Sequence, residues 1–337
     1  MEQNKIRKNS FIVLVLTIIL LYFIIKDNYK EVILDLGRTS IPLLFVALLV
    51  YFISYIFDSL SYYYIVKQYH EEYTLPKAMR LNILTHFFNG ITPLASGGQP
   101  MQLYTLHKDK VRLSDASTCV IQFYIIYQIG LMIVGTVCLA YSIPLHYIDA
   151  TPVAMYMFVI GYIINVAILL FLLFISFNKK FNKAVVNFII NILAKLRIVK
   201  DRVKTKEKWN HNCDGFYESA QLMKKNKGVL IKGVVLQILQ IMFLFSLPFF
   251  VCLATGVDNN LNILSTIAIS SFITICSCYV PIPGATGGVE YGFLSFFGKF
   301  IKESIRVVLI IWRFITYFLP VIIGALVFNI KNKEKKL

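Results

Sequence analysis

Two matching hexapeptides decide how this chain folds: PLASGG at residues 93–98 and PGATGG at residues 283–288. They lie 190 positions apart (283 − 93), and the proline, the alanine and both glycines are identical. Each copy interrupts an apolar segment of a chain that is 57% hydrophobic. Irregular backbone at membrane depth is stable only when it is buried in protein or lines a cavity, because lipid offers no water to unpaired backbone groups. Two such breaks in two halves of a chain indicate a transporter-type binding site; the alternative is a pair of helix-packing loops that share small residues.

The composition is that of a multi-pass integral membrane protein. Mean hydropathy is +0.67 and only 15% of the residues are charged, which excludes an ordinary water-soluble domain. A helix needs about 20 apolar residues to cross the hydrocarbon core. The sequence predicts six full spans: 10–25 (short), 41–66, 114–143, 152–177, 229–255 and 305–330. The first resembles a signal peptide, but no small-residue cleavage site follows it, so we interpret it as a retained anchor.

The net charge of +16 is distributed as in a membrane protein rather than a nucleic-acid-binding protein. Residues 179–227 contain thirteen Lys and Arg against four Asp and Glu, whereas 144–151 and 256–262 contain no Lys or Arg. Loops rich in Lys and Arg stay on the cytoplasmic side. We therefore expect a protein of the cell membrane with both termini and the basic segment in the cytoplasm, and no nucleic-acid partner.

The segments around the two hexapeptides are predicted to be re-entrant helical hairpins. Residues 81–106 are flanked by basic residues on both sides, so this hairpin enters from the cytoplasm and returns to it. Residues 261–301 follow Asp258 and precede a last span that must run inward, so this hairpin enters from outside. One hairpin from each face is typical of inverted-topology repeats. The alternative is that each limb crosses fully, which gives more spans with the same end orientation.

We expect a single all-helical membrane domain over the whole chain. It divides into a first half (1–177) with hairpin 81–106, a cytoplasmic insert (178–228), a second half (229–330) with hairpin 261–301, and a cytoplasmic tail (331–337). Apolar side chains recur in the insert at three- and four-residue steps, which predicts a basic amphipathic helix in the membrane interface. These side chains are Phe181, Val185, Phe188, Ile192, Leu196 and Val199, and the polar face carries Asn182, Lys183, Asn187, Asn191 and Lys195.

Few ionisable side chains fall inside the apolar segments. Placing a charge in hydrocarbon costs free energy, which suggests that these residues have a function. Asp58 lies in the second span, His86 precedes the first break, Glu290 follows the second, and Arg313 lies in the last span. Two interpretations of Arg313 stay open: it extends to the interface, or it shares a central cavity with Glu290 and pairs with it. Asp58 is either close enough to the cytoplasmic end to reach water, or functional.

The two breaks carry groups that suit a phosphate or a carboxylate. Glycine permits positive φ and close backbone approach, and the helix after each Gly-Gly pair directs its N-terminal dipole into the break. Hydroxyl and amide side chains surround these amides. The predicted substrate-binding residues are Asp58, Asn89, Thr92, Ser96, Gly97, Gly98, Gln99, Thr286, Gly287, Gly288, Glu290 and Arg313.

Signatures of soluble enzymes are absent from the sequence. It contains no GxxxxGK[ST] nucleotide loop, no HExxH and no GxSxG nucleophile elbow. Its six cysteines form no CxxC or Cys/His pattern, and we interpret those in apolar stretches as small buried residues. We expect no catalytic residue, no metal and no cofactor.

Three motifs occur in order along the chain: NGITPLASGGQP at 89–100, PIPGATGGVE at 281–290, and RFITYFLP at 313–320. They resemble the lysylphosphatidylglycerol synthase transmembrane family, the flippase-like membrane half of the multiple peptide resistance factor. The resemblance covers nearly the whole chain and implies a lipid-translocating protein. Family members often carry an acid and a base where this chain has Gln99 and Gln102. The full resistance factor also has a soluble domain that transfers lysine to phosphatidylglycerol, and we expect this chain to lack it.

Three functions are weighed. The first is a flippase-like protein that moves a phospholipid (anionic or aminoacylated) or a polyprenyl-linked lipid between leaflets without ATP. The second is a membrane part of, or accessory to, a phosphatidylglycerol lysyltransferase, acting in aminoacyl-lipid synthesis and resistance to cationic peptides. It would work with a separate synthase partner or as a homo-oligomer. The third, a small-solute channel, would need a charge-lined pore, which the predicted spans lack.

Overall fold

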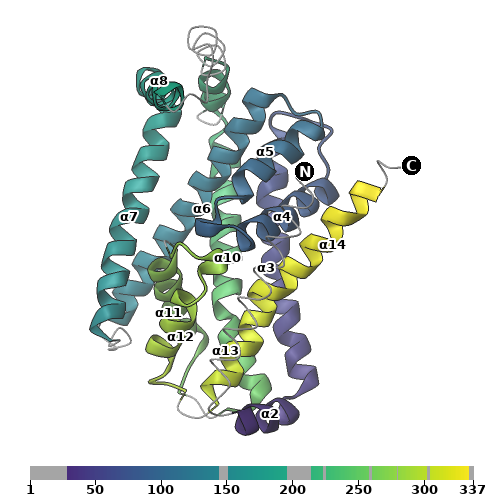
Figure 1. The fold of residues 1–337 in the computed structure, drawn as a ribbon, viewed down its shortest axis with the longest axis vertical. Coiled ribbons are helices and arrows are strands. Elements are labelled where there is room, and N and C mark those ends of the chain that lie inside the picture. The colour runs from purple at the N-terminus through teal and green to yellow at the C-terminus, as the bar shows by residue number, and fades with distance from the viewer. Residues whose placement is uncertain are drawn as a thin grey trace.

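The computed structural model describes residues 29–143, 151–195, 214–222, 225–257, 260–278, 280–301 and 304–333. Within these ranges the fold is all-helical, with no β-strand (Figure 1). The predicted span 10–25 lies outside the described residues, so the presence of this span stays a prediction.

Five helices are long and apolar enough to cross a membrane, and they match the other five predicted spans. They are α3 (Ile41–Lys67), α6 (Leu113–Ser142), α7 (Pro152–Phe177), α10 (Lys227–Thr255) and a continuous last span formed by α13 (Ile305–Arg313), η3 (Phe314–Phe318) and α14 (Leu319–Lys333). The η3 segment is a π-helical turn. Pro320 follows this turn and has no N–H to donate to an α-helical ladder, which favours a local change of hydrogen bonding there.

Two units have the form helix, short break, helix. The first is α4 (Leu75–Gly90), η1 (Pro93–Ala95) and α5 (Gly98–Lys108), and the second is α11 (Ile263–Ser277), η2 (Pro283–Ala285) and α12 (Gly288–Phe297). In Figure 1 the first unit lies toward the upper end of the molecule and the second toward the lower end. The longest of the four limbs, α4, has 16 residues and is about 24 Å long. A limb of this length is shorter than the hydrocarbon core of about 30 Å.

The core lies where α11 meets α6, α7, α10 and α12. Nearly every side chain of α11 from Ser265 to Ser277 is buried, as expected for a helix that is apolar on all sides. Phe272 on α11 packs edge-on against Phe158 of α7. Asn262 and Ser265 form a reciprocal cap at the start of α11, which pairs two backbone N–H groups that would otherwise have no partner. The first limb of the second unit is therefore enclosed by α6, α7, α10 and α12.

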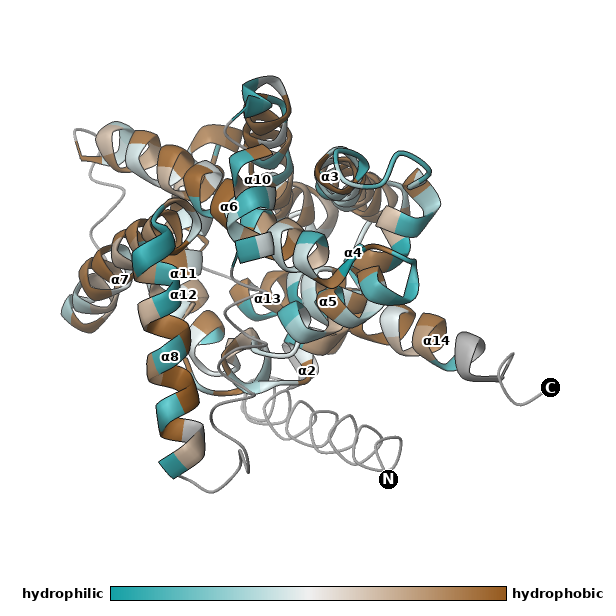
Figure 2. Ribbon diagram, turned by 90° about the horizontal axis from the view of Figure 1, so that it is seen from above, coloured by the Kyte–Doolittle hydropathy of each residue, from teal (hydrophilic) through white to brown (hydrophobic). Residues whose placement is uncertain are grey.

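Two amphipathic helices lie across opposite ends of the bundle: α2 (Tyr29–Arg38) at the lower end and α8 (Lys179–Lys195) at the upper end (Figure 1). Figure 2 shows α8 extending outward from the bundle. Phe188 and Ile192 are exposed, as the predicted apolar face requires. Asn182, assigned to the polar face from the sequence, is instead buried, because its amide donates to the carbonyl of Ile175 at 3.0 Å.

The α8 helix is tied to the segment 214–222 by an ion-pair cluster. The ammonium groups of Lys183 and Lys179 lie 2.8 and 3.0 Å from Oδ1 of Asp214. Hydrogen bonds from these two lysines hold the pKa of the Asp214 carboxyl below its ordinary value. The basic charge of this region is therefore partly neutralised where α8 meets the bundle.

Candidate functional site

The first halves of the two hexapeptides fold alike although their sequences differ at the second position. Leu94 and Ala95 have φ of 54° and 52°, and the equivalent Gly284 and Ala285 have φ of 64° and 50°. Non-glycine residues adopt this left-handed region only at a cost of about 1–2 kcal/mol. Such strain is retained only where the surrounding structure imposes it, and it clusters at functional sites.

In the first break, glycine makes room for capping side chains rather than providing positive φ. Thr92 Oγ1 accepts from the Gly97 amide at 2.8 Å, and Asn89 Oδ1 accepts from the Gly98 amide at 2.9 Å. A Cβ on Gly97 would lie 2.7 Å from Thr92 Cγ2, and one on Gly98 would collide with the Asn89 amide. Gly97 itself has φ of −84°, so the expected left-handed glycine is found only in the second break, where Gly287 has φ of 88°.

The second break is closed by a buried ion pair. The Gly287 amide donates to Glu290 Oε2 at 2.6 Å, and Arg313 Nε donates to Glu290 Oε1 at 2.6 Å. A terminal amino group of Arg313 also donates to the Gly284 carbonyl at 3.0 Å. Arg313 is 7% exposed and Glu290 is 5% exposed, so Arg313 does not extend to the interface, and its predicted pairing with Glu290 is confirmed.

One turn of the last span holds both breaks. Tyr317 follows Arg313 by four residues, and its ring lies 4.7 Å below the Arg313 guanidinium. Its hydroxyl donates to the Gly90 carbonyl at 3.0 Å, directly before the first break. Arg313 therefore fixes the second break and Tyr317 fixes the first. Tyr317 was not predicted from the sequence, although its place in the RFITYFLP motif could have identified it.

The two breaks lie in contact and share a cavity of about 300 Å³. Leu94 and Ala95 line it from the first break, and Gly284 and Ala285 line it from the second. Polar side chains from α4, α11 and the last span also line it, and the rest of the lining is mostly apolar. These polar residues are His86, Asn89, Thr274, Ser277, Arg313, Thr316 and Tyr317.

Of the twelve predicted binding residues, only Asn89 and Arg313 line this cavity, and Asp58 lines an adjoining one. Ser96 and Thr286 instead donate to the carbonyls of Pro93 and Pro283, inside their own breaks. Gln99 is half-buried in the first turn of α5. The remaining six, Thr92, Gly97, Gly98, Gly287, Gly288 and Glu290, belong to the closed breaks described above. A substrate-binding role for these residues stays a prediction.

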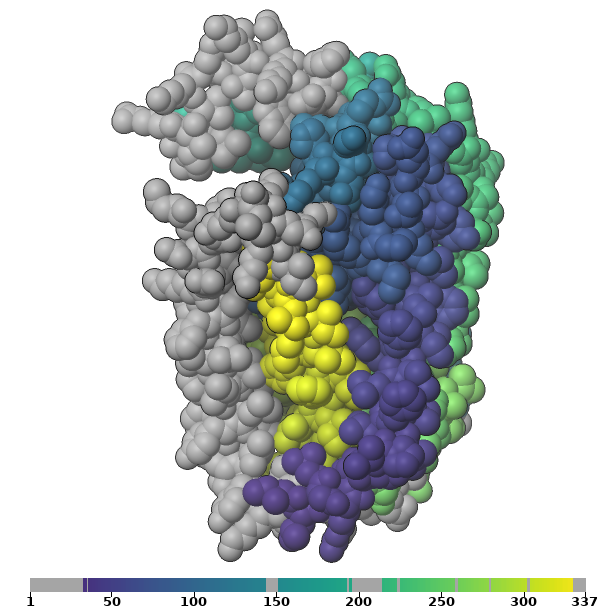
Figure 3. Space-filling view, turned by 90° about the vertical axis from the view of Figure 1, so that its right-hand side faces the viewer, coloured from purple at the N-terminus to yellow at the C-terminus, as the bar shows by residue number. Residues whose placement is uncertain are grey.

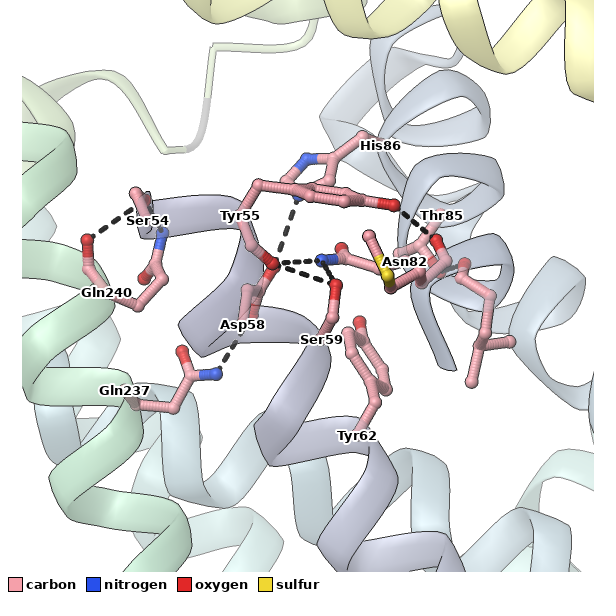
Figure 4. Close-up of polar contacts among 12 residues, drawn as sticks. Ser54, Tyr55, Asp58, Ser59, Tyr62, Asn82, Thr85, His86, Gln237 and Gln240 are labelled. Carbon is pink, nitrogen blue, oxygen red and sulfur yellow. Dashed lines mark hydrogen bonds and ion pairs between the residues drawn. The ribbon is translucent and has the colours of Figure 1, made fainter. Parts of the chain in front are cut away.

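Asp58 belongs to a second polar cluster that joins three helices (Figure 4). Its Oδ2 lies 3.2 Å from His86 Nε2 on α4, and its Oδ1 accepts from Gln237 Nε2 on α10 at 2.9 Å. Asp58 is 7% exposed, which excludes a side chain that simply reaches cytoplasmic water. Beside it, Ser54 Oγ donates to the backbone carbonyl of Gln240 at 3.1 Å.

The Asp58 cluster faces its own cavity of about 110 Å³. His86, Thr274, Trp312 and Thr316 line both this cavity and the one between the breaks, so the two adjoin. Asp58 and Arg313, which carry opposite charges, therefore stand at the two ends of one polar region. Such a region inside membrane-crossing helices can hold a charged or dipolar group that lipid would reject.

The neutral polar side chains that complete this region were not predicted from the sequence. Gln237 and Gln240 are three residues apart on α10, and Ser270, Thr274 and Ser277 follow at steps of four and three on α11. This spacing places each set on one face of its helix. A search for polar residues at helical spacing inside apolar spans would have found both stripes.

The described part of the chain contains no group of three or more His, Cys, Asp or Glu side chains placed to hold a metal ion. The five cysteines in these ranges are free thiols, four of them buried. Cys213 lies outside the described residues.

The helices and the polar region define a multi-pass helical membrane protein with a cavity between two broken-helix units. Residues 10–324 match the family model described as the lysylphosphatidylglycerol synthase TM region. The chain belongs to this family, whose name connects it with membrane lipids. A comparison with curated proteins finds no match.

Proposed function

We propose that this protein moves a phospholipid or a lipid-linked substrate between the leaflets of the cell membrane without ATP. The observation that carries the proposal is the polar region formed by the two adjoining cavities, one lined by both breaks and the other by Asp58. A lipid headgroup crossing hydrocarbon loses its hydrogen bonds to water, and a buried polar path replaces them. Membership of a family named for lipid chemistry supports a lipid as the partner.

We further propose that the two broken-helix units are re-entrant hairpins that enter from opposite faces, as in inverted-topology repeats. Two observations support this arrangement. Each limb is shorter than the hydrocarbon core, and η1 contacts η2. If every limb crossed fully, the two breaks would emerge on opposite faces and could not meet. The basic α8 lies at the same end as the first hairpin, which supports a cytoplasmic entrance for that hairpin (Figure 1).

We propose that the two charged ends of the polar region bind different parts of the headgroup. The Asp58–His86 end suits a positively charged or hydrogen-donating part of the headgroup. Arg313, already paired with Glu290, offers its remaining donors to a phosphate. Both ends have polar partners in the absence of substrate: Asp58 contacts His86 and accepts from Gln237, and Arg313 pairs with Glu290. These buried polar groups therefore keep hydrogen bonds when the cavity is empty.

The test is lipid movement in vesicles that contain purified protein and a trace of headgroup-labelled phospholipid. We expect the protein to accelerate exchange between leaflets without nucleotide. Thr316→Phe fills the junction of the two cavities and should slow exchange by about tenfold, equivalent to about 1.4 kcal/mol of added barrier.

The matched control is Thr136→Phe. Thr136 makes the same type of hydroxyl bond to the carbonyl four residues earlier, but it lies on the exposed side of α6, away from the cavities. Its hydroxyl also lies 2.8 Å from that of Tyr162, so Tyr162→Phe is measured beside it. Wild-type rates in this variant would assign the Thr316 effect to the cavity. Absence of exchange by the wild-type protein, or formation of lysyl-phosphatidylglycerol from lysyl-tRNA by this chain alone, would contradict the proposal.

A further inference from the structure

A third cavity of about 560 Å³ lies outside the polar region, between α3, α4 and α14. Its walls are almost entirely apolar, and several of them are on the outer surface: Phe45, Leu49 and Phe52 on α3 and Ile323 on α14 are all at least 40% exposed. Figure 3 shows the surface of α14, in yellow, beside that of α3, in purple. Since α3 and the last span are long enough to cross a membrane, the exposed wall that they form faces lipid.

Among the described residues, the groove has one charged residue in its wall, at one end. Arg80 of α4 lines the groove, and one of its terminal amino groups donates to both carboxylate oxygens of Asp109 at 2.7 and 2.6 Å. Its side chain is 21% exposed, so part of the guanidinium stays accessible, whereas its Nε–H is buried. Along α3 the groove extends from Phe45 to Tyr55, and this part of the helix is about 15 Å long. An apolar groove with a guanidinium at one end complements a phospholipid, which has apolar chains and a negatively charged phosphate.

Two tyrosines separate the groove from the polar region. Tyr51 and Tyr55 line both the groove and the cavity that contains Asp58. The Tyr55 hydroxyl donates to the Met79 carbonyl, on the α4 wall of the groove. The wall between hydrocarbon and the Asp58–His86 cluster is therefore one layer of aromatic side chains, each attached by rotatable bonds.

We propose that this groove binds one phospholipid, with a hydrocarbon chain along α3 and α14 and its phosphate at Arg80. Tyr51 and Tyr55 form the side entrance through which the headgroup reaches the Asp58 cavity. The entrance rests on the proposed function, whereas the binding of the chain does not. A second copy of the protein is the other possible occupant, but an apolar helix facing the groove would cover the partly exposed end of the Arg80 guanidinium without supplying an acceptor beside Asp109.

The first test is photo-crosslinking in vesicles of phosphatidylglycerol and phosphatidylcholine with a trace of phosphatidylcholine that carries a diazirine in its acyl chain. We expect mass spectrometry to find label concentrated in the peptides that contain residues 45–55 and 319–327. Ile323→Trp fills the groove and should reduce this label several-fold. Ile322→Trp is the matched control, because Ile322 is exposed on α14 but does not line the groove.

The second test separates phosphate recognition from chain binding. In Arg80→Gln combined with Asp109→Asn, we expect about tenfold less labelling by the phospholipid probe, as for the loss of a charge-assisted hydrogen bond of about 1.4 kcal/mol. Labelling by a diacylglycerol with the same diazirine chain should be unchanged. Equal loss of both probes would overturn the assignment of the phosphate to Arg80.

Label spread evenly over all lipid-facing helices, label unaffected by Ile323→Trp, or protein–protein adducts at the groove would overturn the inference. Its failure is distinguishable from that of the proposed function. Lipid exchange without groove labelling contradicts only the groove, and specific groove labelling without lipid exchange contradicts only the transport function.

Discussion

At the residue scale, two buried carboxylates have different kinds of partner: Glu290 forms an ion pair with Arg313, whereas Asp58 contacts His86 and accepts from the amide of Gln237. Glu290 and Arg313 could be paired from sequence because two opposite charges in apolar segments must find partners. The partners of Asp58 could not, because Gln237 is neutral and both His86 and Gln237 lie on helices whose facing sides only the fold defines. The same limit applies to Asn89 and Thr92, whose side chains suited a ligand but close their own break.

Arg313→Ala should destabilise the protein by about 3–5 kcal/mol, because it leaves the Glu290 carboxylate buried and unpaired. Adding Glu290→Gln should recover about 1–3 kcal/mol, since glutamine is neutral and its side-chain oxygen still accepts from the Gly287 amide. The measurement is thermal unfolding in detergent of the wild type, both single variants and the double variant. Strictly additive losses would show that the two side chains are not energetically coupled.

At the element scale, the breaks were predicted correctly in position but only partly in mechanism. Proline and the Gly-Gly pair located both interruptions, because these residues disfavour a continuous helix. The positive φ of Leu94 and Ala95 could not be predicted, since leucine and alanine normally avoid this region. Only comparison with the equivalent Gly284 in the second break reveals why the backbone turns there. The five spans were predictable because apolar length alone defines them.

Gly284→Ala should disrupt the second break more than an ordinary glycine replacement in a helix. Its φ of 64° costs an alanine about 1–2 kcal/mol, and the new Cβ would collide with the Tyr317 ring. Displacing Tyr317 would also weaken its bond to Gly90 in the other unit, so we expect slower lipid exchange as well as a lower Tm.

Gly228→Ala is the control for this replacement. Gly228 lies in the first turn of α10, and a Cβ there meets no atom within 4 Å. Alanine should therefore be neutral or stabilise the helix by up to about 1 kcal/mol. Equal effects of the two alanines on unfolding and exchange would show that the geometry of the second break has no special role.

At the scale of the whole molecule, the sequence predicted two related units but not the way in which one span joins them. The repeat of the hexapeptide indicated equivalence, and charge flanks indicated opposite entry. Arg313 directly precedes the π-helical turn and Tyr317 lies within it. The local winding of the last span therefore decides that these two side chains reach the two breaks. Winding of this kind follows from packing and from Pro320, and apolar length does not encode it.

The last prediction concerns the arrangement of both units in the membrane. In a background without the six native cysteines, single cysteines are placed at two exposed sites: His107→Cys, at the end of α5, and Lys299→Cys, after α12. If the hairpins enter from opposite faces, an impermeant thiol reagent should label His107→Cys only from the cytoplasmic side and Lys299→Cys only from outside. A third variant, Ser96→Cys, separates re-entrant limbs from full crossings, because a full crossing would carry the first break to the outer face. Exclusive labelling of Ser96→Cys from outside would therefore contradict the meeting of the two breaks inside the membrane, and with it the shared cavity on which the transport proposal depends.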